Sequence, residues 1–267
     1  GVVNRLTDHY DEIIKDASCR LATYALTGDA DFTGDDIHYA SDHDFVGIEF
    51  SIHGPLDGRV RVGMPGKFNA DNALAALAVC SLALSGGSGE LDGNTKQAIL
   101  SSLENVRVDG RMEIAYVSKK CSVIVDYAHN AVSMESLLTT LRDYHPKRLV
   151  CVFGCGGNRA KDRRYSMGES GGKMADFCNI TADNPRFEKN EDIIKDIEVG
   201  LAKTDGKYIV IPDRREAIFS AIHNAEEGDM IAIIGKGHED YQEIEGVKHH
   251  FLDREVVEEA VHALSEQ

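Results

Sequence analysis

The chain has 267 residues, enough for one large domain or two modest domains with hydrophobic cores. Its 42% hydrophobic and 28% charged residues are typical of a globular protein, and no long uncharged apolar run predicts a membrane span. The formal net charge of -16 repels nucleic-acid phosphates and anionic membrane surfaces, so neither is an expected partner. Any anionic ligand has to be held by locally placed cations or backbone amides.

The 6 cysteines lie mostly in apolar, strand-like stretches, which favours reduced thiols and a cytoplasmic location. Cys151 and Cys155 form a CxxxC pair, but no second Cys or His pair follows at the spacing of a zinc site. We interpret both as packing residues at the end of a strand. The sequence predicts no metal site.

The first part of the chain is predicted to pack strands beside helices. Two of its strand-like runs alternate apolar and polar residues, as half-buried antiparallel strands do. An Ala- and Leu-rich helix follows and ends at a glycine-rich stretch. The expected strands cover residues 19–27, 44–52 and 58–64, and the expected helices cover 72–85 and 94–103.

After Gly110 the pattern changes to strand, loop and helix in repetition. Apolar runs separated by amphipathic helices predict an α/β fold with a doubly wound parallel sheet. The expected strands cover residues 121–128, 148–154, 176–182, 207–212 and 229–235. The expected helices begin near Ser133 and cover 166–174, 191–202 and 214–225.

Four polar loops follow these strands, and we expect them to converge on one edge of the sheet. They read DYAHN (126–130), GCGGNR (154–159), DNPR (183–186) and GKGHE (235–239). The glycines of the second loop allow backbone amides to approach an anion, but a tight turn explains them equally well. This loop lacks the second half of a dinucleotide-binding GxGxxG, and the fourth lacks the rest of a Walker phosphate loop.

Arg159 and Arg186 each end one of these loops, and both are expected to face the same crevice. Because a guanidinium binds a carboxylate in two places, the pair indicates a substrate with carboxylate groups. Glu239 is suited to accept an ammonium group, and His129 to contact phosphate or ribose. The alternatives are surface arginines, a solvated acidic turn and a structural histidine.

Taken in order, these loops and their neighbours resemble the Mur ligase family of peptidoglycan synthesis. The matching stretches are MPGKFNADNALAA (64–76), GRMEI (110–114), VDYAHN (125–130), VFGCGGNR (152–159), DNPRFE (183–188), DRREAI (213–218), GKGHEDYQ (235–242) and DRE (253–255). Within the family, the chain is most similar to the members that add the third residue of the stem peptide. The resemblance implies the rear part of the central ATPase domain in residues 1–110 and a Rossmann-like C-terminal domain in 111–267.

The resemblance further implies ATP-dependent amide-bond formation through an acyl phosphate. The implied cofactors are ATP and Mg²⁺, and the implied substrates are UDP-N-acetylmuramoyl-L-alanyl-D-glutamate and meso-diaminopimelate. The family's GTNGKT phosphate loop and its carbamylated lysine have no counterpart in these residues. We therefore expect most Mg²⁺ ligands to lie outside this chain and the chain alone to be inactive, and we assign no catalytic residue.

By the same resemblance, Asn72 is expected to contact adenine and Arg111 the ATP phosphates, with Asp126 and His129 near the nucleotide. The implied amino-acid pocket consists of Arg159, Asp183, Asn184, Arg186, Gly235 and Glu239. The two arginines would bind a carboxylate and Glu239 the distal ammonium. Arg186 favours diaminopimelate over lysine, because only diaminopimelate has a second carboxylate.

Other functions remain open at this point. They are a lysine-adding member of the family, a ligase like folylpolyglutamate synthetase and a non-catalytic ligand-binding module. A dinucleotide-dependent dehydrogenase ranks last, because its glycine motif is incomplete.

Overall fold

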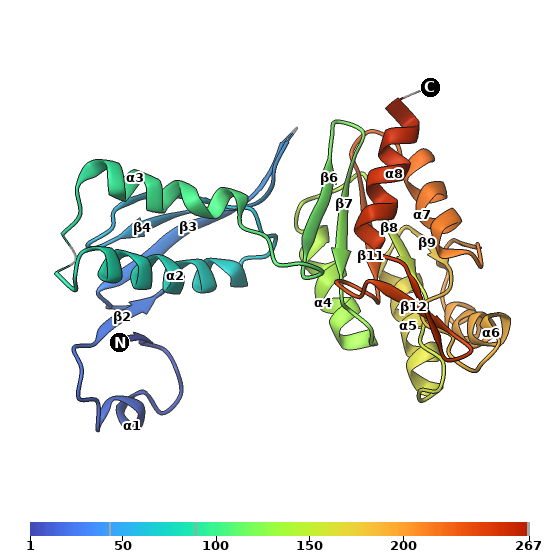
Figure 1. Cartoon of the computed structure of the whole chain (residues 1–267), viewed down its shortest axis with the longest axis horizontal. Helices are drawn as coiled ribbons and strands as arrows, with labels where there is room; N and C mark the ends of the chain where they lie inside the picture. Colours follow the sequence, from blue (N-terminus) through green and yellow to red (C-terminus); the bar gives the residue numbers. More distant parts are fainter. Residues whose placement is uncertain (43, 89, 266–267) are drawn as a thin grey trace. The chain divides into compact units, whose positions relative to one another are not determined.

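A computed structural model describes residues 1–42, 44–88 and 90–265 of the chain. The chain divides into two compact units, one formed by Gly1–Ser41 with Phe45–Val106 and the other by Asp42–Asp44 with Arg107–Gln267 (Figure 1). No helix among the described residues is both long and apolar enough to cross a membrane.

The first unit is a five-stranded sheet with two longer helices packed on it. The strands, in their order across the sheet, are β1 (Val2–Asn4), β2 (Ala22–Ala25), β3 (Phe32–Ser41), β4 (Val46–His53) and β5 (Gly58–Val62). The helices are α1 (Tyr10–Ile14), α2 (Phe68–Leu84), α3 (Gly93–Ser102) and the 3-10 turn η1 (Leu103–Asn105). β1 to β3 pair in parallel, and β3 to β5 are antiparallel.

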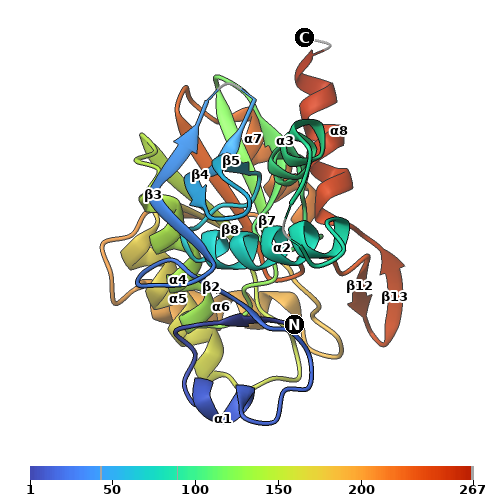
Figure 2. The ribbon, with the colours of Figure 1, turned by 90° about the vertical axis from the view of Figure 1, so that its left-hand side faces the viewer.

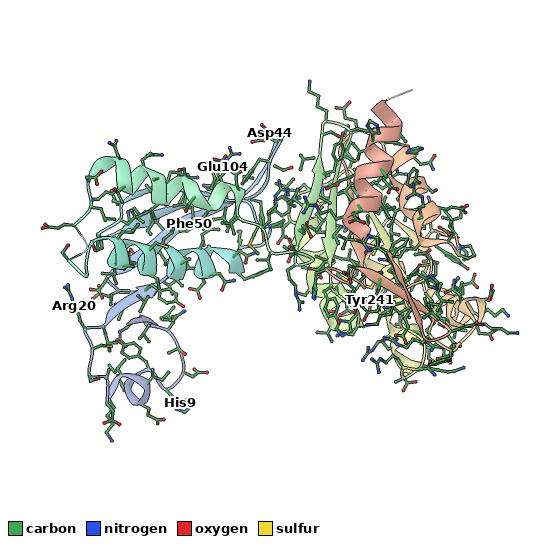
Figure 3. The ribbon with its side chains drawn as sticks, viewed as in Figure 1. His9, Arg20, Asp44, Phe50, Glu104 and Tyr241 are labelled. Carbon is green, nitrogen blue, oxygen red and sulfur yellow. The ribbon has the colours of Figure 1, made fainter. Side chains whose placement is uncertain are left out.

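Alternate residues of β4 form the core of this unit. Ile48, Phe50 and Ile52 are fully buried and pack in one cluster with Leu74 of α2 and Leu100 of α3. Figure 2 gives a second view of α2 and α3 beside the sheet, and Figure 3 labels Phe50. The predicted strands over residues 44–52 and 58–64 correspond to β4 and β5, which are antiparallel neighbours as their alternating patterns suggested.

The predicted strand over residues 19–27 is too long, because β2 covers only Ala22–Ala25. The chain turns back at Gly28, whose φ of 84° suits glycine. Asp31 closes the turn by accepting hydrogen bonds from the backbone N–H and the hydroxyl of Thr23, at 2.8 and 2.9 Å. Strand β3 was not predicted, because Asp35 and Asp36 interrupt its apolar residues. Its pairing with β4 is also irregular between Asp35 and His38.

The second unit is built on a six-stranded sheet of order β10-β9-β8-β11-β7-β6. Five strands are parallel, and only β6 at the edge is antiparallel to its neighbour β7. The strands are β6 (Glu113–Val117), β7 (Cys121–Asp126), β8 (Arg148–Phe153), β9 (Phe177–Ile180), β10 (Tyr208–Val210) and β11 (Asp229–Ile234). A separate hairpin consists of β12 (Tyr241–Ile244) and β13 (Val247–His250).

Helices cover both faces of this sheet (Figure 1). They are α4 (Ala131–Arg142), α5 (Asp162–Met174), α6 (Asn190–Leu201), α7 (Arg214–His223) and α8 (Asp253–Ser265). Helices α7 and α8 pack on the face that carries Val150 and Val152. Phe153 points to the opposite face, beside Met134 of α4 and Gly171 of α5. The predicted doubly wound α/β fold is confirmed.

One buried ion pair joins the starts of α7 and α8 to the sheet. Arg214 and Asp253 are both completely buried, and the guanidinium Nε and Nη2 donate to the two carboxylate oxygens at 2.7 Å each. Arg214 also donates to the carbonyl oxygens of Ala182 and Ile234, at 3.1 and 3.0 Å. These carbonyls lie directly before two of the predicted binding loops, so the pair fixes where those loops begin.

We expect Asp253→Ala to lower the free energy of unfolding of the second unit by about 3–5 kcal/mol, because it leaves the Arg214 charge buried without a partner. Urea denaturation followed by circular dichroism measures the change. The matched control is Glu259→Ala, which removes the partner of Arg215 in an exposed pair between the same helices and should cost about 0–1 kcal/mol. Equal losses in the two variants would contradict the anchoring role of Asp253.

Candidate functional site

A cavity of about 460 Å³ lies in the second unit, where the loops that follow β7, β8, β9 and β11 meet. Its wall contains all six residues of the predicted amino-acid pocket, namely Arg159, Asp183, Asn184, Arg186, Gly235 and Glu239. It also contains His129, which was predicted to lie near the nucleotide. The predicted convergence of four polar loops is therefore confirmed in space, whereas the roles of the residues stay predictions.

Two glycines allow these loops to approach one another. Gly235 has a φ of 113°, and a side chain there would lie 2.6 Å from a carboxylate oxygen of Asp183. A side chain at Gly157 would lie 1.9 Å from the carbonyl oxygen of Pro185. Only glycine fits at either position without moving the neighbouring loop.

Two carboxylates, those of Asp183 and Glu239, line the cavity. Glu239 accepts a hydrogen bond from the Asn184 side-chain amide at 2.9 Å and lies 3.5 Å from the Lys236 ammonium. Burial raises the pKa of the Asp183 carboxyl, against the opposing influence of the nearby Arg214 and Lys236 charges. Among the described residues, no hydrogen bond is donated to the carboxylate of Asp183. The two carboxylates are therefore suited to an ammonium group.

Three arginines supply the opposite charge. Arg159, Arg163 and Arg186 all line the cavity. Within the described part of the chain, the guanidinium groups of Arg159 and Arg163 make no ion pair. Arg186 donates from Nη1 to the Gly157 carbonyl at 2.9 Å, and its Nε lies 3.3 Å from a carboxylate oxygen of Glu243. A cavity lined by both carboxylates and guanidinium groups suits an amino acid with more than one carboxylate.

Asp126 holds the backbone beside the cavity. Its two carboxylate oxygens accept hydrogen bonds from the backbone N–H groups of Met112 and Ala128, both at 2.7 Å. Burial raises the pKa of this carboxyl, and the two hydrogen bonds oppose the rise. Asp126 thus fixes the positions of the segments that carry Arg111 and His129.

The other predicted nucleotide residues lie in two places. In the second unit, the Arg111 guanidinium lies 5.1 Å from the centre of the Tyr127 ring, and the His129 ring lies 4.9 Å from it. In the first unit, Asn72 is on α2 and donates to the side-chain oxygen of Asn69 at 3.1 Å.

The sequence analysis missed several residues of the cavity wall. Arg163 lies in the first turn of α5, which begins at Asp162, whereas Arg159 belongs to the loop before it, so no helical spacing in the sequence connects the two. Tyr127 lies inside a loop that was already singled out. Tyr241 was missed because the hairpin that begins with it was not predicted; Figure 3 labels this residue.

The two cysteines of the predicted CxxxC pair, Cys151 and Cys155, are buried free thiols, and Cys155 also lines the cavity. Burial raises the pKa of Cys155 to about 12, which keeps it protonated at neutral pH. The described residues contain no group of three or more His, Cys, Asp or Glu side chains suited to a metal ion.

Comparison with known proteins gives matches along most of the chain. Residues 1–80 match the Mur ligase middle domain, and residues 110–237 match the Mur ligase, glutamate ligase domain. UDP-N-acetylmuramoyl-L-alanyl-D-glutamate--2,6-diaminopimelate ligase 2 of Clostridium acetobutylicum is 40% identical over 261 residues, which are 97% of this chain and 51% of that protein. The corresponding ligase of Thermosynechococcus vestitus is 40% identical over 252 residues, covering 93% and 47%.

Solved structures give the same picture. A UDP-N-acetylmuramoyl-L-alanyl-D-glutamate--2,6-diaminopimelate ligase superposes with a TM-score of 0.75 and 32% identity, covering 100% of this chain and 53% of that one. Folylpolyglutamate synthase of Thermotoga maritima has a TM-score of 0.57 at 20% identity, covering 83% and 47%, and shares the fold alone. The chain spans about half the length of the curated relatives it matches. With its middle and C-terminal domain matches in this order, the chain belongs to the Mur ligase family.

Proposed function

We propose that this chain is part of an ATP-dependent ligase that joins meso-diaminopimelate to UDP-N-acetylmuramoyl-L-alanyl-D-glutamate in peptidoglycan precursor synthesis. The observation that carries the proposal is the cavity whose wall contains Arg159 and Arg186 together with Asp183 and Glu239. The 40% identity to ligases named for this reaction supports it.

In this proposal residues 111–267 form the amino-acid-binding domain, and residues 1–110 the rear part of the ATP-binding domain. The division of the chain into two compact units, with a boundary in the sequence between Val106 and Arg107, supports this assignment. The family matches, which change from one model to the other between residues 80 and 110, agree with it.

The proposed reaction phosphorylates the glutamyl carboxylate with ATP, after which the amine of diaminopimelate attacks the acyl phosphate and releases phosphate. The contribution of this chain is to orient the amine. Arg186 and Arg159 bind carboxylate, and Glu239 accepts the distal ammonium, so that the other amine is presented in one orientation. Asp183 adds negative charge beside the ammonium, and Asn184 holds Glu239 in place.

The nucleotide is assigned to Asn72, Arg111 and His129, with Asp126 acting as a positioning residue. Because both Asp126 oxygens already accept backbone hydrogen bonds, its part is to hold the loops that carry Arg111 and His129. Mg²⁺ belongs to the proposed reaction. By the resemblance to the family, most of its ligands are assigned to residues outside this chain. The six free thiols favour the cytoplasm as the location.

A lysine-adding ligase is the nearest alternative. Lysine has no carboxylate on its distal carbon, so it would leave a guanidinium in the cavity wall without an anion. Arg186 therefore favours diaminopimelate.

We expect Arg186→Ala, in the complete ligase that the proposal requires, to lower kcat/KM for meso-diaminopimelate about thirty- to a thousand-fold. The reason is the loss of about 2–4 kcal/mol of charge-assisted binding to the distal carboxylate. The value of kcat/KM for lysine should fall far less. Arg215→Ala, which removes an exposed arginine of α7, is the control for net charge. An unchanged ratio between the two amino acids would exclude Arg186 as the carboxylate ligand.

We also expect the purified 267-residue chain to show no steady ATP hydrolysis, because no phosphate-binding loop of the GTNGKT type occurs in it. A coupled assay for released phosphate, with a no-protein control, measures this. Hydrolysis above that control would contradict the assignment of the phosphate-binding loop to residues outside this chain.

A further inference from the structure

Strand β12 is bonded along its length to the DNPR loop. The Gln242 side-chain amide donates to the Asp183 carbonyl at 2.9 Å, and the backbone N–H of Glu243 donates to the Asn184 side-chain oxygen at 2.9 Å. The backbone N–H of Arg186 donates to the Glu243 carbonyl at 2.9 Å, and that of Glu245 to the Arg186 carbonyl at 2.7 Å. Three residues of the proposed diaminopimelate pocket are thus attached to one short strand.

Arg186 needs this attachment because its backbone is strained. Its φ of 54° lies in the left-handed region, which residues other than glycine seldom adopt. The two backbone hydrogen bonds to β12 form an isolated parallel bridge that holds Arg186 opposite Ile244. The backbone that carries the guanidinium is therefore held in one position in the wall of the cavity.

The side chain of Glu243 then acts on the guanidinium itself. A guanidinium has five N–H groups. In Arg186, Nε lies 3.3 Å from a Glu243 carboxylate oxygen in an ion pair and Nη1 donates to Gly157, which leaves both N–H groups of Nη2 available to a ligand. Both side chains of the pair are about one-fifth exposed, which makes the contact less screened than a surface ion pair. Glu243 does not line the cavity.

We propose that Glu243 is a specificity-determining positioning residue, whose carboxylate holds the Arg186 guanidinium so that its remaining N–H groups meet the distal carboxylate of diaminopimelate. This inference rests on the proposed function and adds a residue to it. A second effect opposes the first, because the Glu243 charge also repels that carboxylate. The cavity wall contains three arginines and two carboxylates, and this excess of positive charge offsets the repulsion. We therefore expect the positioning of Arg186 to determine the net effect of Glu243 on binding.

The experiment is calorimetric titration of meso-diaminopimelate and L-lysine into the purified 267-residue chain, which contains the whole cavity. Glu243→Ala should weaken diaminopimelate binding about three- to tenfold, the effect of freeing one long side chain. Lysine binding should change less than twofold. Glu243→Gln keeps the length of the side chain and a polar oxygen beside the Arg186 Nε but removes the charge, and it should recover part of the loss.

Two further variants separate positioning from general structural damage. Glu227→Gln removes the same charge from an exposed position before β11, outside the cavity wall, and should leave diaminopimelate binding unchanged. In the Arg186→Ala background, Glu243→Ala should have no additional effect, because its target is gone. Thermal unfolding curves check that each variant is folded.

The outcomes distinguish this inference from the proposed function. If the wild-type chain binds neither amino acid, the assignment of the cavity to diaminopimelate fails, and this inference fails with it. If the wild type binds diaminopimelate and Arg186→Ala weakens it, but Glu243→Ala leaves it unchanged or tighter, only the role of Glu243 is overturned. Equal weakening of lysine binding by Glu243→Ala would also overturn it.

Discussion

The bidentate pair between Arg214 and Asp253 is the interaction on which the site depends. Two opposite charges are fully buried here, an arrangement that is favourable only when the remaining donors are also satisfied. The carbonyls of Ala182 and Ile234 satisfy them. As a result one guanidinium determines where two helices begin and where the loops after β9 and β11 leave the sheet.

Those loops explain how a chain with a net charge of -16 contains a cavity suited to carboxylates. The overall field of the protein repels an anion, so recognition depends on cations within a few ångströms of the ligand. Arg159 and Arg163 stand on the segment after β8, and Arg186 on the segment after β9. Asp183 and Glu239 come from the loops after β9 and β11, so both signs of charge line one cavity of about 460 Å³.

The hairpin of β12 and β13 holds one of these loops, DNPR, in position. Its own residues are half-exposed or exposed, and it has no hydrophobic core of its own. Its value lies in the backbone groups of β12, which pair with the DNPR loop and hold Arg186 in a left-handed conformation. A strained residue persists only when its surroundings fix it, and such residues are concentrated at binding sites.

The sequence by itself determined the alternation of strands and helices after Gly110, because buried parallel strands are continuous apolar runs that need no tertiary information to be seen. It also placed Arg159, Asp183, Asn184, Arg186, Gly235 and Glu239 at strand ends, where the carboxyl edge of a parallel sheet brings them together. Strand β3 and the hairpin escaped prediction, since neither has the continuous apolar run of a buried strand and each is defined by its pairing with the neighbouring strand. The contacts of Glu243 with Arg186 and of Arg214 with Asp253 were likewise decided only by the tertiary structure, because they join residues 57 and 39 positions apart and a sequence carries no record of which long-range partners its charges meet.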